Sequence, residues 1–559
     1  MMDRNAESHF GHIETTNIKR SMFSEIFRNL STCNAGDIIP FLAYSDILPG
    51  DTVKCQTSAV VRMQTPLNPT MDDAFVDIYY FAIPHRLVWE HWKQFMGENK
   101  DTAWTTQTEY EVPMFNAPTG GIATGTNLDY MGVPKGVENI KFSQLPSRAL
   151  VLTYNTWFRK QAIIAPATEY NDDTIRTASN TVSELGGKPF KASKIADYFT
   201  TCNPEPQKNL PGMDTPTIPL GESAPVITSD KVSSVANNIG MTWSDVTNNN
   251  WIKSESTANY TNLRIGDTAG NAQGATVATA ANGTDVGYLN TLAPRNLVVN
   301  LTQATAATIN ALRLYFQIQK LCELGARAGT RYFEILKSEF GTSPSMSALQ
   351  YPEYLGGKRN PLNITQITQT SSTTGTDTEL GGTGGMSHTT FTNDDFTKTF
   401  QEHTILLGLM VIRQYHTYQQ GLHRMWTRKK KLDYYTPMLA HLGEQPVYKR
   451  ELMCTGTESD DAVFGYQERW AEYKYGQQII TGEMNSKYAQ SQDVWHYGDH
   501  YDDVPTLAQN WIEETPDYID RTIKVKHNVS HQFKFDIVSN MIFTRPMPVY
   551  CTPGLIDHF

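Results

Sequence analysis

Segments with a two-residue apolar period, lying far apart in the chain, constrain its fold most strongly. Residues 74–81 alternate between two faces before Pro84 ends the segment. The same period returns at residues 532–537, and residues 403–418 form a long β-branched and aromatic stretch. This period indicates β-strands. Strands so distant in sequence must pair with one another, so we expect a mainly β fold, a sandwich or a barrel.

Helical segments interrupt the strand pattern. Residues 147–161 carry apolar side chains at helical spacing after Pro146. A second helix is predicted to begin near Ala306 and to stop at Gly325, and residues 330–340 resume helical character. We expect these helices to lie between strands, with their apolar faces, including Phe316 in the second one, packed in the core.

Two stretches of low complexity stand out. Residues 217–300 are rich in Thr, Asn, Ala and Gly and poor in charge, which predicts a surface insertion. Its aromatic residues favour a small folded protrusion, an outward-facing recognition element, over a mobile loop, and they are Trp243, Trp251 and Tyr260. Residues 369–390 are predicted to form a flexible loop. The expected domains are therefore a first part of the core (1–216), the insertion (217–300) and a second part (301–559).

The charge balance argues against a protein that coats nucleic acid. The chain has 47 Lys and Arg against 58 Asp and Glu, a formal charge of -11. Any nucleic-acid contact must then be local. One cluster has the basic and aromatic groups of a single-strand contact: Arg424, Trp426, Arg428, Lys429, Lys430 and Lys431, with His423, Tyr434 and Tyr435 beside them. A solvated basic loop is the competing interpretation.

The cysteines and the N-terminus indicate a protein that stays in a reducing compartment. No CxxC or Cys/His finger spacing links the six cysteines, which are Cys33, Cys55, Cys202, Cys322, Cys454 and Cys551. We expect free thiols. The first residues lack the apolar core of a secretory signal, and no apolar run is long enough for a membrane span.

No catalytic, cofactor or metal site is predicted. The chain lacks a phosphate-binding loop and the GxSxG, HExxH and EF-hand patterns. Residues 493–503 hold groups that could bind a divalent cation, namely His496, Asp499, His500, Asp502 and Asp503, but an exposed loop is the preferred interpretation. Glu468 and Glu472 could serve as glycosidase acids only if the fold placed them suitably.

Many ordered segments resemble the major capsid proteins of gokushoviruses, a branch of the microvirus family. In chain order they include PFLAYSDILPGDTV (40–53), FAIPHRLVWEHWKQFMGE (81–98), QLPSRALVLTYNTWFRKQ (144–161), DYFTTCNPEPQK (197–208), FQIQKLCELGARAGTRYFEILKSEFG (316–341), YPEYLGG (351–357), YQQGLHRMW (418–426), LGEQPV (442–447), FGYQERWAEYKYG (464–476) and PGLIDHF (553–559). Two features depart from the family pattern: residues 325–329 read GARAG where a double glycine is common, and the insertion matches nothing.

The resemblance implies a fold and a role. The fold would be an eight-stranded antiparallel jelly roll with long loop insertions and a few helices. Sixty copies would form a T=1 icosahedral shell around a circular single-stranded DNA genome, assembled in the bacterial cytoplasm, with the insertion as a threefold, host-attachment protrusion. The implied partners are further copies of the chain, the packaged DNA, a small basic DNA-binding protein, scaffolding and minor capsid or pilot proteins, and a host surface receptor.

Several aromatic residues are candidates for anchors between subunits, although core packing is at least as good an interpretation for each. They are Trp89, Trp92, Tyr466, Trp470, Tyr473 and Phe559. Two other functions fit the composition: a β-sandwich carbohydrate-binding protein or adhesin, and an intracellular glycosidase. The absence of a signal peptide argues against the first, and the second would require turnover of oligosaccharides.

Overall fold

A computed structural model describes residues 18–99, 106, 108–208, 309–329, 331–370, 380–476 and 478–550, together with the backbone of six short strands between residues 226 and 299. The chain divides into two compact units. The first comprises Met1–Lys208 and Glu323–Phe559, and the second comprises Asn209–Cys322. The domain boundaries expected from the sequence stay a prediction.

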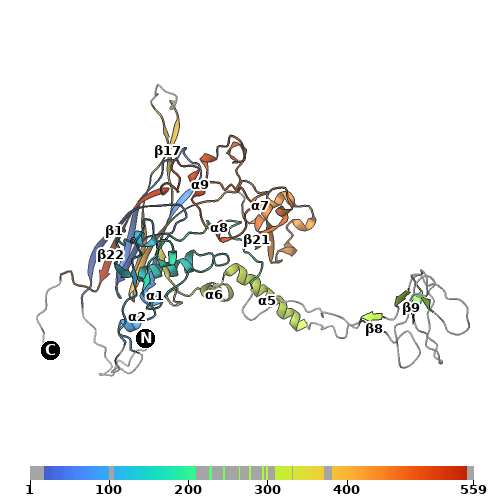
Figure 1. Ribbon diagram of the computed structural model, residues 1–559, viewed down its shortest axis with the longest axis horizontal. Helices are drawn as coiled ribbons and strands as arrows, with labels where there is room; N and C mark the ends of the chain where they lie inside the picture. The colour runs from blue at the N-terminus through green and yellow to red at the C-terminus, as the bar shows by residue number, and fades with distance from the viewer. Residues whose placement is uncertain are drawn as a thin grey trace, which may run out of the picture. The chain divides into compact units, whose positions relative to one another are not determined.

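Two antiparallel sheets form the centre of the first unit (Figure 1). One sheet has the order β1 (Ser21–Cys33), β22 (Phe533–Arg545), β3 (Thr52–Met63), β18 (Thr389–Thr399). The other has the order β14 (Glu353–Gly356), β4 (Ala74–Pro84), β19 (Thr404–Gln414), β2 (Ile39–Ile47), and β15 (Arg359–Pro361) also pairs with β4. The mainly β prediction is confirmed, and the strands predicted near residues 74–81, 403–418 and 532–537 are β4, β19 and β22.

The two sheets enclose the main core. In β22 every second side chain is buried, beginning with Phe533, as the alternation in the sequence requires. These side chains pack with those of the second sheet in one cluster that includes Val76, Ile78 and Met410. A hydroxyl network crosses this core, because the Tyr80 hydroxyl lies 2.7 Å from the hydroxyl oxygens of both Thr57 and Ser539. The sheets are thus joined by apolar packing and by satisfied polar groups.

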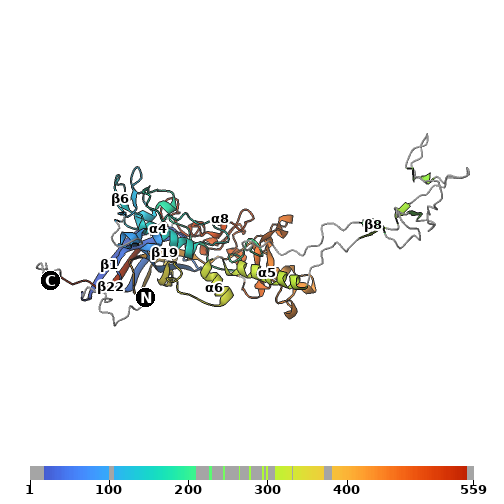
Figure 2. The ribbon, with the colours of Figure 1, turned by 90° about the horizontal axis from the view of Figure 1, so that it is seen from below.

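A helical layer covers the outer face of the second sheet. Helix α4 (Leu145–Thr153), continued by a π-helical turn (Tyr154–Phe158), lies beside β19 (Figure 2). It contributes Leu150 to a core cluster with Phe81 and Leu407. The strand β19 is therefore buried on both faces, which explains its nearly continuous apolar sequence. The helix predicted at residues 147–161 is confirmed.

The other two predicted helices need one correction each. Helix α5 (Ile309–Ala328) continues through Gly325 and ends before Gly329, whose φ of 99° lies in the left-handed region. Phe316 is 59% exposed, so the expectation that this apolar face is buried is wrong for that residue. Helix α6 (Tyr332–Phe340) ends at Gly341 with φ 69°, as predicted.

The low-complexity stretch at residues 369–390 is not simply a loop. Strand β17 (Thr383–Ser387) pairs antiparallel with β16 (Ile364–Thr368), and the two project from the sheets as a hairpin (Figure 1). Strand β18 follows from Thr389. The flexible-loop prediction is therefore wrong for the part after residue 382, because the Gly-rich strand β17 pairs with β16, which precedes it in the chain.

The remaining elements are short. In the first unit they are α1 (His85–Val88), α2 (Trp92–Phe95), β5 (Met114–Asn116), α3 (Asn127–Tyr130), β6 (Lys141–Ser143), β7 (Arg176–Thr177), β20 (Glu444–Tyr448), α7 (Lys449–Leu452), β21 (Val463–Glu468), α8 (Gln509–Ile512) and α9 (Asp517–Asp520). In the second unit they are β8 (Val226–Thr228), β9 (Trp243–Asp245), β10 (Leu263–Arg264), β11 (Thr276–Val277), β12 (Leu292–Pro294) and β13 (Leu297–Val299).

Five of the six cysteines lie among the described residues, and all five are free thiols, as expected. Four of them are buried. None of the described helices is both long and apolar enough to cross a membrane.

Candidate nucleic-acid interface

The basic cluster lies in the long connection between β19 and β22, on a segment of short 3₁₀ turns. These turns are Arg424–Thr427, Lys431–Asp433 and Pro437–Leu439. The Asp433 carboxylate accepts the backbone N–H groups of Lys430 (2.7 Å) and Lys429 (2.8 Å). Those two hydrogen bonds lower the pKa of Asp433. One carboxylate thus holds the backbone of the lysine run in a fixed turn.

The two arginines of the cluster point into the protein. A guanidinium nitrogen of Arg424 lies 2.9 Å from Glu451, and Arg428 lies 3.5 Å from Glu472. The side chains of both arginines are at most 14% exposed. Burial alone would lower the pKa of Arg424, but Glu451, Tyr198 and Glu472 together outweigh burial, and the pKa is raised. These arginines balance buried carboxylates, so they are not available to a phosphate in this arrangement.

Apart from His423, which is half-buried and accepts the backbone N–H of Met425, the other members of the cluster face solvent. Trp426 is 72% exposed, Tyr434 53% and Tyr435 48%, and the three lysines are exposed. We call this set the lysine–aromatic surface: Trp426, Lys429, Lys430, Lys431, Tyr434 and Tyr435. Among the described residues no carboxylate lies within ion-pair distance of the three ammonium groups. The surface can therefore offer positive charge to phosphates and rings to unpaired bases.

Exposed apolar side chains beside this surface were missed by the sequence reasoning. Met438 is 94% exposed, Leu432 63% and Met425 50%. They have no helical or strand period that would have marked them as a group.

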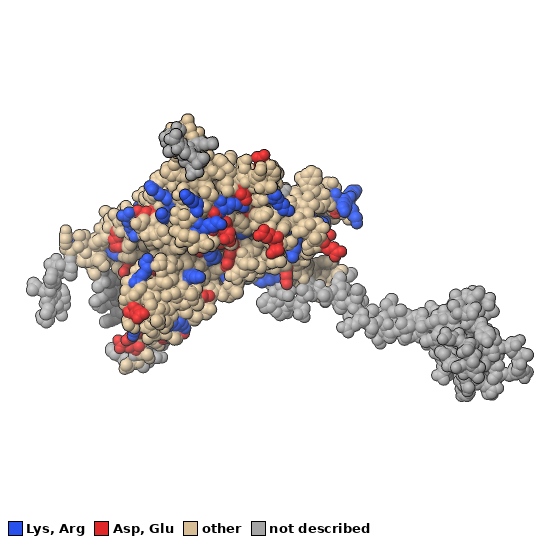
Figure 3. Space-filling model, turned by 45° about the horizontal axis from the view of Figure 1, so that its top comes forward, with Lys and Arg blue, Asp and Glu red and all other residues tan. Residues whose placement is uncertain are grey.

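Positive and negative side chains are mixed over the visible face of the described part (Figure 3). No wide field of one sign covers it, and one compact group of Lys and Arg stands at its right edge. This distribution agrees with the expectation that any nucleic-acid contact is local.

The acidic and histidine-rich segment 493–503 is divided between core and surface. Asp499 is fully buried, between Lys194 (3.0 Å) and His416 (2.7 Å), while Asp502 and Asp503 are exposed. His496 is 8% exposed and its Nε2 lies 2.8 Å from the Met484 carbonyl, and His500 is half-buried. The exposed-loop interpretation is therefore wrong for His496 and Asp499, whose polar atoms are used by the protein itself.

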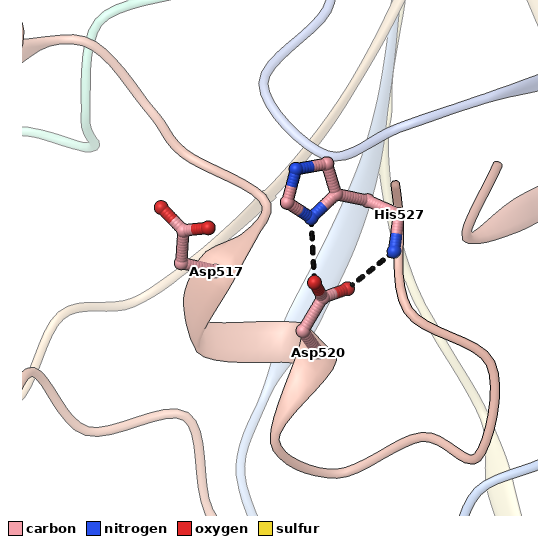
Figure 4. A group of neighbouring side chains, drawn as sticks. All are labelled: Asp517, Asp520 and His527. Carbon is pink, nitrogen blue, oxygen red and sulfur yellow. Dashed lines mark hydrogen bonds and ion pairs between the residues drawn. The ribbon is translucent and has the colours of Figure 1, made fainter. Parts of the chain in front are cut away.

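A different group has the composition of a cation site. Asp517, Asp520 and His527 bring their ligand atoms within 4.8 Å of one another (Figure 4). Asp520 already accepts the backbone N–H of His527 (2.9 Å) and the Gln532 side-chain amide (2.6 Å), and one of its oxygens lies 2.5 Å from Nδ1 of His527. The protein thus satisfies the Asp520 carboxylate without an ion.

The carboxylates that might serve a glycosidase are already engaged. Glu468 pairs with Lys474 at 2.6 Å, and Glu472 accepts a hydrogen bond from Gln445 at 2.6 Å. A cavity of about 180 Å³ does lie beside Glu472, and it also contacts Asp197 and Glu451. Asp197 accepts from the Tyr418 hydroxyl (2.6 Å) and Glu451 from the Tyr198 hydroxyl (3.1 Å). Each of these carboxylates is therefore engaged by a neighbouring side chain of the protein itself.

The structure places the candidate aromatic anchors differently from one another. Trp89 and Trp470 are buried, at 0% and 4% exposure, so core packing is the correct interpretation for both. Trp92 and Tyr466 are partly buried, and Tyr473 is 50% exposed. Phe559 lies outside the described residues. So do Trp251, Tyr260 and the side chain of Trp243, the three aromatic residues predicted for host recognition.

Comparison with known proteins gives matches along nearly the whole chain. The family described as "Capsid protein (F protein)" matches residues 11–555. The capsid protein VP1 of Spiroplasma virus 4 is 36% identical over 565 residues, which covers 99% of both chains. The capsid protein VP1 of Bdellovibrio phage phiMH2K is 35% identical over 560 residues, covering 100% of this chain and 99% of the relative. The capsid protein VP1 of Chlamydia phage 1 is 31% identical over 589 residues, covering 98% of each.

Proposed function

This chain belongs to the capsid protein (F protein) family of phages, and we propose that it is the major capsid protein of a gokushovirus-type microvirus. Members of this family are structural proteins of the virion that assemble into a capsid. We propose further that sixty copies form a T=1 icosahedral shell around a circular single-stranded DNA genome. The family match over residues 11–555 carries this proposal, because it leaves no large part of the chain for another function.

The strand order supports an eight-stranded jelly roll as the capsid fold. Four strands in the order β1, β22, β3, β18 oppose four in the order β14, β4, β19, β2, and all are antiparallel. In each sheet, strands that end by Pro84 alternate with strands that begin at or after Glu353, as two interleaved Greek keys require. The core lies between the two sheets and does not depend on the long insertions, so the connections can vary in length without loss of the fold.

The lysine–aromatic surface is the proposed contact with packaged DNA. Its lysines carry unpaired charge and its rings are exposed, which suits unpaired bases and phosphates. The proposal covers Trp426 and the three lysines. Arg424 and Arg428 support the turn from inside. Because the chain has a formal charge of -11, the genome needs another source of positive charge. We therefore propose a small basic DNA-binding protein as a companion.

The insertion at residues 217–300 is the proposed protrusion at the threefold axes and the proposed host-attachment element. Its charge-poor Thr, Asn and Gly composition supports contact with a host surface molecule. Scaffolding proteins and minor capsid or pilot proteins are the further proposed partners, and the bacterial cytoplasm is the proposed place of assembly.

Electron microscopy of the expressed chain tests the central proposal. The chain would be produced alone and together with the scaffolding and basic proteins encoded beside its gene. We expect closed isometric particles whose mass, divided by the subunit mass of 62.8 kDa, gives sixty copies. Monodisperse monomers in the presence of those companions would refute the capsid proposal, and binding assays on glycans would then test the carbohydrate-binding alternative.

A further inference from the structure

Strand β1 has an exposed apolar stripe that its own sheet does not cover. Met22, Ile26 and Leu30 are 71%, 70% and 72% exposed, at a spacing of four residues on the outer face of the strand. Their neighbours across the ladder on β22 are Thr544, Asn540 and Asp536. All three of these directly opposite neighbours are polar, while the apolar Ile542 and Val538 of the same face lie diagonally, opposite Ser24 and Arg28. The stripe nevertheless stays about 70% exposed.

The same strand lies at the edge of its sheet. β1 pairs with β22 on one side and, among the residues that the structure describes, with no strand on the other (Figures 1 and 2). Its backbone can therefore accept another strand over most of its 13 residues. Within the described ranges, the C-terminal end of this edge is occupied, since the Tyr130 hydroxyl donates to the Thr32 carbonyl at 2.8 Å.

Edge strands of soluble proteins are normally protected against such pairing. Short length, proline, free lysines and bulges are the usual protection. β1 is long and contains no proline or lysine. Its arginine, Arg28, forms an ion pair with Asp536 at 2.6 Å, and Glu25 lies 3.6 Å from Arg545. The charges of the strand are therefore partnered within the chain, and an unprotected apolar edge remains.

The spacing of the stripe makes β1 complementary to itself. If two copies of β1 pair antiparallel with Ile26 opposite Ile26 of the second copy, Met22 falls opposite Leu30 on both sides of the centre. Residues directly opposite in an antiparallel pair share one face, so the three apolar positions of each strand meet. This register uses only residues that are already in strand conformation.

We propose that β1 pairs with β1 of a second copy of this chain across a twofold axis, with Ile26 at the centre. The pairing joins two four-stranded sheets into one continuous sheet and places the two apolar stripes side by side. An interface of this kind is isologous, as a twofold contact in a closed shell must be. The inference rests on the proposed self-assembly of the chain and adds the surface through which one of its contacts forms.

Cysteine crosslinking tests both the pairing and its register. Ile26→Cys places two thiols directly opposite each other, so we expect a disulfide-linked dimer after mild oxidation of assembled particles. Ser24→Cys is the matched control on the same face. In the proposed register the two introduced thiols lie roughly 14 Å apart, four residues at about 3.4 Å each, and should not crosslink. The native chain, oxidised in parallel, gives the background from its own cysteines.

A charge substitution tests whether assembly depends on the strand. Ile26→Lys sets two ammonium groups opposite each other and should abolish particles while leaving the melting temperature of the free subunit close to that of the native chain. Val529→Lys, at a residue that is 78% exposed elsewhere in the first unit, should still assemble.

The outcomes separate this inference from the capsid proposal. If the native chain forms no particles even with its companions, the proposed function fails. If native particles form but Ile26→Cys particles give no dimer above background, or Ser24→Cys crosslinks in its place, the β1 pairing is overturned while the capsid function stands. Normal particles from Ile26→Lys would overturn the pairing as well.

Discussion

His416 and Asp499, 83 residues apart in the chain, form a fully buried ion pair with Nδ1 of the imidazole 2.7 Å from the carboxylate. The other ring nitrogen lies 2.9 Å from Glu514, and Lys194 lies 3.0 Å from Asp499. Two cations thus face two carboxylates, so the group is neutral when the imidazole is protonated. It connects the end of β19 to the long segment that precedes β22.

Replacing His416 should destabilise the first unit strongly. His416→Gln leaves Glu514 buried without its cation, which we expect to cost about 3–5 kcal/mol at pH 7. Chemical denaturation of the free subunit measures the change. His388→Gln, at an exposed histidine, is the control and should change the free energy of unfolding by less than about 0.5 kcal/mol. Equal effects of the two substitutions would contradict the role of the buried group.

The same histidine predicts a loss of stability at alkaline pH. Burial alone would lower the pKa of His416, but Asp499 and Glu514 outweigh burial and raise it to about 9. The folded-state pKa lies above the unfolded value, so the stabilisation is complete below about pH 6.5 and is lost as pH rises through about 9. The difference in unfolding free energy between the native chain and His416→Gln should therefore shrink from pH 7 to pH 10. A constant difference would contradict the raised pKa.

Replacing Asp395, in contrast to replacing His416, should stabilise the first unit. Burial raises its pKa to about 6, although the Thr57 hydroxyl donates a hydrogen bond to it. Because the folded-state pKa lies above the unfolded value, the protonated carboxyl stabilises the fold. This stabilisation is complete below about pH 3.8 and is lost as pH rises through about 6, so at pH 7.5 the buried carboxylate is charged and the fold is weaker. Asp395→Asn should raise the free energy of unfolding at pH 7.5 by about 1–2 kcal/mol, after allowance for solvent screening of this partly exposed group.

A thermal-unfolding series from pH 4 to pH 8 measures the effect of Asp395→Asn. The gain should disappear near pH 4, where the native carboxyl is protonated. Asp394→Asn, at the exposed neighbour, should give no comparable gain at any pH. A gain from Asp395→Asn that does not depend on pH would show that repacking, and not charge, is its cause.

The lysine–aromatic surface predicts a specific loss of single-strand binding. Replacing Lys429, Lys430 and Lys431 together with Gln should weaken binding of an oligothymidylate to the purified chain and reduce the slope of log affinity against log salt by about 2, at roughly 0.7 per phosphate contact. Fluorescence titration at several salt concentrations measures both. The matched control replaces three exposed lysines elsewhere, Lys487, Lys524 and Lys526. Equal losses of binding from both triple variants would show that the effect comes from overall charge and not from this surface.

Replacing a buried arginine of the basic cluster should destabilise the protein. Arg424→Gln leaves Glu451 without the guanidinium that lies 2.9 Å away, at an expected cost of about 3–5 kcal/mol in unfolding free energy. Lys431→Gln, in the same segment but exposed, should cost less than about 0.5 kcal/mol. Urea denaturation of both variants measures these changes. A negligible change in unfolding free energy for Arg424→Gln would contradict its structural role, and Arg424 would again be a candidate for DNA contact.

Local patterns predicted three of the principal strands and the end of α6 correctly. The alternation at residues 532–537 gave β22, and Gly341 ended α6 where a left-handed residue was expected. Gly325 did not end α5, because a glycine within a helix is a tolerated cost and the left-handed residue is Gly329. Residue propensity thus identifies possible helix ends, and the surrounding contacts determine which of them is used.

The amino-acid sequence by itself determined the mainly β class, the places of the principal strands and, through the resemblance that the comparisons confirm, the capsid family. These depend on periodicity and on ordered motifs, which the linear chain contains. Tertiary structure decided which charges of the basic cluster face solvent. Arg424 and Lys429 look equivalent in sequence, but Glu451 lies beside only one of them after folding. The buried group around His416 and the uncovered edge of β1 were decided in the same way, because burial and ion pairing depend on which distant segments the fold brings together.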